Sequence, residues 1–303
     1  MAADQAGLAA ASLLDKRTLQ AAGVLLPIQL QALSFFSGRH PLGRAGEGMR
    51  FLRTREFDAG QDNPRDIDKF SPPGEYLVTD WEAEAQASIL LYTDFSASMK
   101  FAAKSAVLNQ LLMQLTYSLW RATDRVRTVL YDSQRRELVG ERNLKRQLEE
   151  LMRHLQDTRL VPGQDVTDVL AAHRNNGASR ADLVFVLSDF CPVAADAEVA
   201  DLATWRVVLR SAGCDVIPIV ISFELAEGQR GCVRLWDAER RAHRLTLLTP
   251  TRIARINARE QERTTTLETL FRRLGLDYVV LRGANDVYPE LARLARWRRR
   301  HRK

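Results

Sequence analysis

An apolar run in the sequence stops at an aspartate, and two serines follow at alternate positions. The aspartate is Asp94, at the end of A-S-I-L-L-Y-T-D, and the serines are Ser96 and Ser98. A second aspartate, Asp189, follows the apolar run L-V-F-V-L-S. Two carboxylates and two hydroxyls are hard oxygen donors, which suit Mg²⁺ or Mn²⁺ with water completing the coordination. These residue types predict a divalent cation site if the fold brings the two segments together.

Apolar runs of strand length alternate with helical patterns from residue 87 onward. The predicted strands are 89–93, 126–131, 183–187, 216–223 and 278–281, and the predicted helices are 102–121, 144–156, 166–174, 197–211, 251–274 and 289–300. A hairpin is expected over 232–248. The alternation is typical of an α/β protein with an open, mostly parallel, Rossmann-like sheet and helices on both faces. Ligands of such sheets bind outside the carboxyl ends of the strands, so Asp94 and Asp189 are expected at one edge.

The N-terminal third of the chain has a different pattern. Residues 13–36 have helical apolar spacing, and residues 37–73 are rich in charge and contain five glycines, which favour turns. A short edge strand is predicted over 76–82. We therefore expect an irregular N-terminal arm over 1–85 and a regular α/β domain over 86–303.

The amino-acid composition and the distribution of charge indicate where in the cell the protein resides. The 303 residues carry a net charge of +6, and residues 281–303 hold eight basic and two acidic side chains, which accounts for the whole excess. Neither a signal peptide nor a membrane-spanning segment is expected from the sequence. The three cysteines are scattered, which favours a reducing compartment, and the five histidines show no zinc-binding spacing. A cytoplasmic protein is predicted.

Two motifs together carry a resemblance to known families. The segment D-F-S-A-S has the D-x-S-x-S pattern of von Willebrand factor A-type domains, which carry a metal-ion-dependent adhesion site. Upstream, R-E-F-D-A-G-Q-D-N-P-R-D-I-D resembles the signature of the bacterial family called domain of unknown function fifty-eight, which contains such a domain. The resemblance covers about residues 46–281 and implies a von Willebrand factor A-like fold.

The resemblance also implies which residues form the metal site. The implied ligands are Asp94, Ser96, Ser98, Gln164, Thr167 and Asp189. Gln164 stands where the family has a threonine in the middle loop, and Thr167 follows three residues later. The upstream signature departs from the family at Gln61, which replaces an acid, and at Lys69-Phe70, which replaces a tryptophan.

The function that the resemblance implies is protein interaction without catalysis. In such sites the serines bind the metal directly and the aspartates act largely through water, so the ion stays electrophilic and accepts a partner's carboxylate. Members of the family resemble partners of MoxR-type AAA+ ATPases, which assist the assembly or activation of other complexes. The chain resembles in size the member encoded with methanol-oxidation genes, which implies a role in methanol dehydrogenase maturation.

Two other functions and several structural roles remain open from the sequence. A metal-dependent phosphoester hydrolase could use Asp94 at the end of its strand, although Ser96 stands where a D-x-D enzyme has its second acid. The basic C-terminal tail could bind nucleic acid. Ser98 could instead cap the following helix, and Asp94 could bind loop amides. An ion-pair network that locks the arm onto the domain is expected among Arg55, Arg65, Asp66 and Asp68.

Overall fold

The computed structural model describes most of the chain from residue 40 to residue 301. The described residues are 40–301 except 86, 122–123, 135, 141–142, 158, 173–180, 192–201, 227–230 and 238–241. The helix predicted for 13–36 therefore lies outside the described residues. Among the helices that the structure describes, none is long and apolar enough to cross a membrane.

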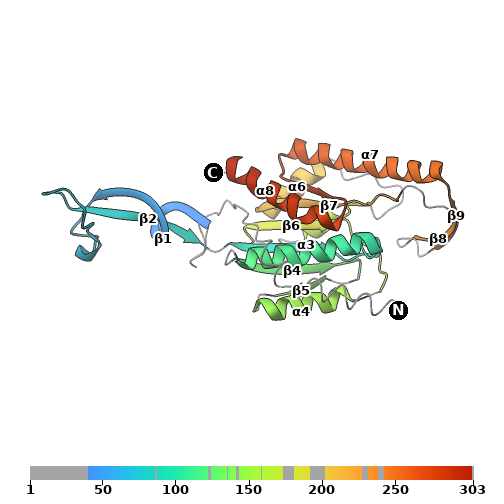
Figure 1. Ribbon diagram of the computed structural model, residues 1–303, viewed down its shortest axis with the longest axis horizontal. Coiled ribbons are helices and arrows are strands. Elements are labelled where there is room, and N and C mark those ends of the chain that lie inside the picture. The colour runs from blue at the N-terminus through green and yellow to red at the C-terminus, as the bar shows by residue number, and fades with distance from the viewer. Residues whose placement is uncertain are drawn as a thin grey trace.

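A six-stranded sheet forms the centre of the molecule (Figure 1). Its strand order is β10-β7-β6-β3-β4-β5, and all neighbours are parallel except β5, which is antiparallel to β4. The strands are β3 (Ser88–Asp94), β4 (Arg125–Tyr131), β5 (Arg136–Val139), β6 (Leu183–Ser188), β7 (Asp215–Ile221) and β10 (Val279–Leu281). The prediction of an open, mostly parallel α/β sheet is confirmed, and β5 is an edge strand that the sequence pattern did not indicate.

Helices cover both faces of this sheet. They are α3 (Ala102–Arg121), α4 (Leu144–Leu155), α5 (Val166–Ala171), α6 (Leu202–Ala212), α7 (Pro250–Leu274) and α8 (Val287–His301). One core cluster contains residues of α3, α4 and α8, and the other contains residues of α5, α6 and α7. The prediction of helices on both faces is confirmed.

The apolar run of β3 follows from burial on two sides. Ile89 and Leu91 point into the core cluster beneath α3, whereas Leu90 and Tyr92 point into the cluster on the opposite face. Successive side chains of a strand face opposite sides of the sheet, so a central parallel strand needs apolar residues at every position. The run ends where the strand leaves the core, and Asp94 is its last residue.

A long two-stranded ribbon precedes the sheet. Strand β1 (His40–Glu56) pairs antiparallel with β2 (Leu77–Ala85), and a short 3-10 turn, η1 (Pro64–Asp66), lies between them. Figure 1 shows the ribbon extending away from the sheet, beyond the end at which β3 begins. The strand predicted over 76–82 is confirmed. The expectation of turns through the glycine-rich segment is wrong for β1, because two irregularities in register, between Pro41 and Ala45 and between Ala45 and Arg50, accommodate its glycines within a strand.

Charged side chains fix the ribbon internally. The two terminal nitrogens of the Arg55 guanidinium donate to the Asp62 carboxylate, at 2.5 and 2.6 Å, and its third nitrogen, Nε, donates to Asp80 at 3.1 Å. Arg53 also donates to Asp80, at 3.0 Å. Arg55 thus forms ion pairs as predicted, but its partners among the described residues are Asp62 and Asp80 rather than Asp66 and Asp68, and these pairs lie within the arm instead of joining it to the domain. It joins the two strands of the ribbon and the turn between them.

The predicted hairpin is present between β7 and α7. It consists of β8 (Gly231–Asp237) and β9 (Ala242–Leu248), which pair antiparallel. Because the chain enters it from the carboxyl end of β7, the hairpin lies on the edge of the sheet where Asp94 and Asp189 are found (Figure 1). Leu245 and Leu247 of this hairpin are exposed to solvent.

Candidate functional site at the carboxyl edge of the sheet

Asp94 and Asp189 lie at the same edge of two neighbouring strands. Asp94 ends β3, and Asp189 directly follows β6. The two strands are parallel and adjacent, with Thr93 opposite Leu187. β3 has β6 on one side and β4 on the other, so the sheet is extended in both directions from this point. Such a switch in direction is where open α/β sheets bind ligands.

Neutral groups surround the Asp94 carboxylate. Its Oδ1 accepts a hydrogen bond of 2.9 Å from the Ser96 amide, and its Oδ2 accepts one of 2.7 Å from the Ser188 hydroxyl. The hydroxyl oxygens of Ser96 and Ser98 are 3.0 Å apart. Asp94 and Ser96 are buried, and Ser98 is half-buried. The structure therefore brings the three residues of the D-x-S-x-S motif together, and Ser188 is an additional contact that the motif did not indicate.

The surroundings of Asp94 favour its protonated form. Burial, followed by the negative charge of Asp189, raises the pKa of Asp94 to about 7, although hydrogen bonds from Ser188 and Ser96 act in the opposite direction. Burial alone disfavours a carboxylate because the interior solvates charge poorly, and a second carboxylate adds repulsion. Among the described residues, Asp94 thus has no ion-pair partner.

The negative charge of Asp189, in contrast, is balanced by a nearby positive charge. Its Oδ2 lies 2.6 Å from the ammonium nitrogen of Lys104, and its Oδ1 accepts a hydrogen bond of 3.0 Å from the Cys191 amide. Burial raises the pKa of Asp189, but Lys104, the Cys191 amide and Arg263 outweigh burial and lower that pKa to about 2. Sequence reasoning missed Lys104, whose only signal is its position in the first turn of the helix that follows the motif.

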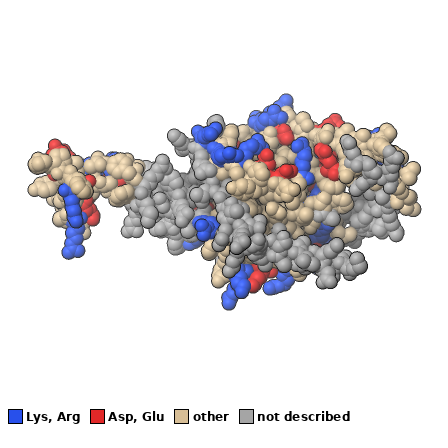
Figure 2. Space-filling view, in the orientation of Figure 1, with Lys and Arg blue, Asp and Glu red and all other residues tan. Residues whose placement is uncertain are grey.

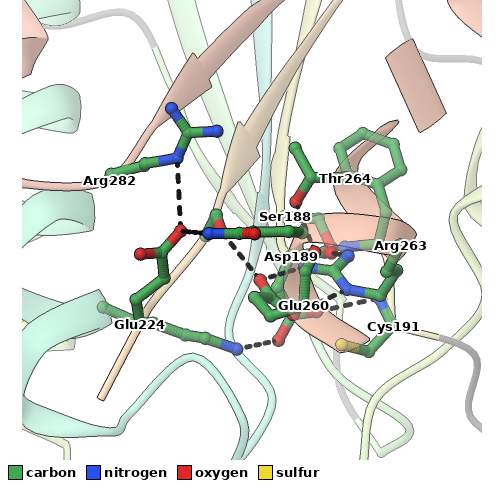
Figure 3. Close-up of polar contacts among 12 residues, drawn as sticks. Ser188, Asp189, Cys191, Glu224, Glu260, Arg263, Thr264 and Arg282 are labelled. Atoms are coloured by element: carbon green, nitrogen blue, oxygen red, sulfur yellow. Dashed lines mark hydrogen bonds and ion pairs between the residues drawn. The ribbon is translucent and has the colours of Figure 1, made fainter. Parts of the chain in front are cut away.

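A polar network extends from Asp189 along the edge (Figure 3). Arg263 of α7 donates to the backbone carbonyl of Asp189 and contacts the Glu260 carboxylate with two nitrogens, at 2.5 and 2.9 Å. The Ser222 hydroxyl, just beyond β7, donates to Glu260 at 2.8 Å. Because Arg263 and Glu260 belong to α7, the helix holds the loops after β6 and β7 in fixed positions.

The residue after Asp189 has an unusual backbone conformation. Phe190 has a φ of 54°, in the left-handed region that non-glycine residues seldom adopt. Its amide donates to the Ser188 hydroxyl at 2.9 Å, and its ring packs against Trp205 and Phe271 at centroid distances of 6.3 and 5.5 Å. Such strain persists only where surrounding contacts determine it, as this aromatic packing does. The turn directs Asp189 toward Lys104.

The middle loop crosses the ends of β3 and β4. The carbonyls of Val161 and Pro162 accept hydrogen bonds from the amides of Ala97 and Ser133, at 2.7 and 2.9 Å. Gln164 is nevertheless exposed, and Thr167 is half-buried in the first turn of α5. Among the described residues, no hydrogen bond joins Gln164 or Thr167 to the other implied ligands. The structure thus gathers Asp94, Ser96, Ser98 and Asp189, and places no contact from Gln164 or Thr167 among them.

The gathered donors are of a type that a hard divalent cation accepts. They are two carboxylates and two hydroxyls, and one carboxylate is buried without a cationic partner. Magnesium and manganese prefer such oxygen donors and retain several waters. Within the described part of the chain, no three His, Cys, Asp or Glu side chains form a metal-binding group. The donor set therefore fits a site in which serine hydroxyls serve as ligands.

An aromatic pair, formed by the exposed Phe101 and the half-buried Phe223, lies beside this site. Phe101 follows the D-x-S-x-S loop closely in sequence and is 51% exposed, and Phe223 follows Ser222 at the end of β7. Their rings contact each other edge to face, with centroids 4.8 Å apart. The segment that carries Phe223 is anchored to α7 by two hydrogen bonds between Leu225 and Asn257, of 2.8 and 2.9 Å. The edge thus presents an apolar surface in a fixed position.

Solved structures share parts of this architecture at low similarity. BatB from Bacteroides thetaiotaomicron is 11% identical, with a TM-score of 0.41 and coverage of 71% of this chain and 99% of that one. An aerotolerance-related membrane protein from Bacteroides fragilis is 10% identical, with a TM-score of 0.42 and coverage of 70% and 99%. The pilus adhesin SpaC from Lactobacillus rhamnosus is 12% identical, with a TM-score of 0.45 and coverage of 70% and 30%. These values carry no argument about function.

A family model, unlike the solved structures, shows to which family this chain belongs. No curated protein matches the chain. The model of a single family, described as protein of unknown function DUF58, matches residues 53–266, which include the second strand of the ribbon, the D-x-S-x-S loop, Asp189 and most of α7. The chain therefore belongs to the DUF58 family.

Proposed function

We propose that this protein is a non-enzymatic interaction module with a von Willebrand factor A-like domain, whose carboxyl edge binds Mg²⁺ or Mn²⁺ and docks a partner protein. The observation that carries the proposal is the buried Asp94 carboxylate, which receives only neutral hydrogen bonds beside a second acid. A cation held by Asp94, Ser96 and Ser98 would supply the missing positive charge. Few anionic ligands would surround it, so a partner's carboxylate could complete its coordination.

The proposed partner is a MoxR-type AAA+ ATPase or its client in the cytoplasm. This part of the proposal rests on the family resemblance of the two sequence motifs, and methanol dehydrogenase maturation is its narrowest form. The exposed Phe101, held against Phe223, supports a protein partner, because aromatic side chains in fixed positions are common anchors of protein interfaces.

The two alternative functions have less support. A hydrolase that used Asp94 as nucleophile would need the carboxylate to reach substrate, but Asp94 is 5% exposed and its side-chain partners are serines. Nucleic-acid binding would need a continuous basic surface. On the face drawn in Figure 2, basic and acidic side chains are interspersed over the described part of the domain.

The first test is a calorimetric titration of the purified chain with Mg²⁺ and Mn²⁺. We expect binding in the parent and its loss in Asp94→Ala, because this change removes the buried carboxylate that the proposed site would use to hold the cation. Asp132→Asn is the matched control, since Asp132 is a buried acid at the end of the neighbouring strand β4. Binding that survives Asp94→Ala, or that is lost equally in Asp132→Asn, would contradict the proposed site.

The second test addresses docking. Capture of a MoxR-type ATPase by the parent should require Mg²⁺ or Mn²⁺, and both chelation and Asp94→Ala should abolish it. Capture that is unaffected by either treatment would show that docking does not use the metal.

A further inference from the structure

The ion pair between Lys104 and Asp189 is placed within the candidate metal site itself. The Lys104 ammonium is 2.6 Å from Asp189 Oδ2, and the two side chains are 14% and 2% exposed. Burial lowers the pKa of Lys104, but Asp189 and neighbouring groups outweigh burial and raise it, so the side chain is cationic at neutral pH. Water screens such a sheltered pair only weakly.

With this contact, both oxygens of the Asp189 carboxylate already accept a hydrogen bond. One oxygen accepts from Lys104, and the other accepts from the Cys191 amide. A divalent ion between Asp94 and Asp189 would be separated from the Lys104 ammonium only by the Asp189 carboxylate. At that range two positive charges repel each other strongly in a poorly solvated site. The ion and the ammonium therefore compete for Asp189.

A second carboxylate, that of Glu260, acts on the Lys104 ammonium through its charge. Glu260 already contributes to the field that raises the pKa of Lys104. Glu260 is held by Arg263 and by the Ser222 hydroxyl at the same edge. Arg263 donates its hydrogen bond to the backbone carbonyl of Asp189 and not to the carboxylate of that residue. Among the described cationic side chains, Lys104 is thus the one that contacts an implied metal-binding carboxylate directly.

We propose that Lys104 is the residue that sets the metal affinity of this edge, because its ammonium competes with the divalent cation for Asp189. The inference rests on the metal site of the proposed function and adds a competitor that belongs to the chain itself. Metal affinity in the parent is then weak, and removal of the charge at position 104 increases it.

The test is a calorimetric titration with Mn²⁺ of the parent, Lys104→Gln and Lys104→Arg. Glutamine keeps a hydrogen-bond donor toward Asp189 without the charge, whereas arginine keeps the charge. We expect Lys104→Gln to bind Mn²⁺ at least about tenfold more tightly than the parent, and Lys104→Arg to bind as weakly as the parent. Addition of Asp94→Ala to Lys104→Gln should remove the binding again. Thermal unfolding of each variant checks that it is folded.

A second measurement uses the parent chain and does not depend on any variant. Brief acetylation with acetic anhydride, read by mass spectrometry, should modify Lys104 faster when saturating Mn²⁺ displaces it from Asp189. Lys145 is the internal control, because its side chain is 83% exposed and lies on α4. Its rate should not change.

The outcomes separate the two proposals. Equal Mn²⁺ affinity in the parent and Lys104→Gln, or unchanged acetylation of Lys104 in a chain that binds Mn²⁺, overturns the competition and leaves the metal site standing. Absence of binding in the parent and in Lys104→Gln overturns the metal site and the competition together. Weak binding in the parent and tighter binding in Lys104→Gln supports both.

Discussion

Asp94 illustrates how a single buried side chain can lower the stability of a fold. Its pKa is raised to about 7 by burial and by Asp189, whereas the ordinary value in an unfolded chain is 3.8. The folded state therefore binds more protons than the unfolded state between these values, and its stability falls as the pH rises from about 4 to about 7. Above that range the carboxylate is charged in both states and the full cost remains.

This sign gives a prediction for Asp94→Asn. Without metal, at pH 8, we expect the variant to be more stable than the parent by about 1 to 3 kcal/mol, because it removes a buried charge and keeps an acceptor for the Ser96 amide. At pH 5 the difference should be smaller, because the parent's carboxyl is then protonated. Urea unfolding in the presence of a chelator measures both values. A variant less stable than the parent at pH 8 would refute the destabilisation that we assign to the buried charge of Asp94.

The sequence identified some residues of the site and missed others for physical reasons. Asp94 and Asp189 were predictable because each ends an apolar run, and the edge of a parallel sheet gathers such residues. Lys104 was not, because its contact spans 85 residues and depends on how α3 packs. Gln164 was placed in the site by the motif alone, yet its side chain is exposed.

At the scale of elements, α8 shows why a basic tail need not be a solvated one. Leu291, Leu294 and Ala295 are buried in the core, and the helix predicted at this position is confirmed. Arg298 of the same helix is fully buried and forms ion pairs with Asp215 and Asp277, beside β7 and β10. At least one of the basic residues counted in the tail thus joins the helix to the sheet.

Loss of this anchor should be costly. We expect Arg298→Met to destabilise the protein by about 3 to 5 kcal/mol, because it leaves two carboxylates without their buried partner. Arg300→Met is the matched control, since Arg300 is exposed on the same helix, and it should change stability by less than about 0.5 kcal/mol. Urea unfolding measures both. Equal effects of the two changes would mean that the ion pairs contribute nothing specific.

The ribbon was the least predictable element. Its second strand alternates well enough to be recognised, but the first contains several glycines, which ordinarily mark turns. Register irregularities between Pro41 and Ala45 and between Ala45 and Arg50 let that segment remain paired. Pairing with residues far along the chain cannot be read from local propensity, because context decides whether such a segment is a strand.

The whole molecule has two ends with different characters. The carboxyl edge of the sheet holds the D-x-S-x-S loop, the Lys104–Asp189 pair and the hairpin β8–β9, whereas the ribbon leaves from the opposite edge (Figure 1). Helix α3 connects them, because it begins after the D-x-S-x-S loop and ends before β4 begins at the amino edge. An exposed aromatic side chain lies near each end of this helix: Phe101 just before it, 51% exposed, and Trp120 in its last turn, 45% exposed.

These two aromatics allow docking to be located on the molecule. If a partner docks at the carboxyl edge, Phe101→Ser should weaken its Mg²⁺-dependent binding by about tenfold or more, as loss of an interface anchor does. Trp120→Ser removes an aromatic of similar exposure from the other edge and should change the affinity by less than about twofold. Interferometry with an immobilised MoxR-type ATPase measures both. The opposite ranking would place the partner at the ribbon end, and the metal edge would then need another role. If Phe101→Ser alone weakens binding, the metal site and the aromatic pair are parts of one docking surface. Phe101 lies three residues before Lys104, the residue that contacts Asp189.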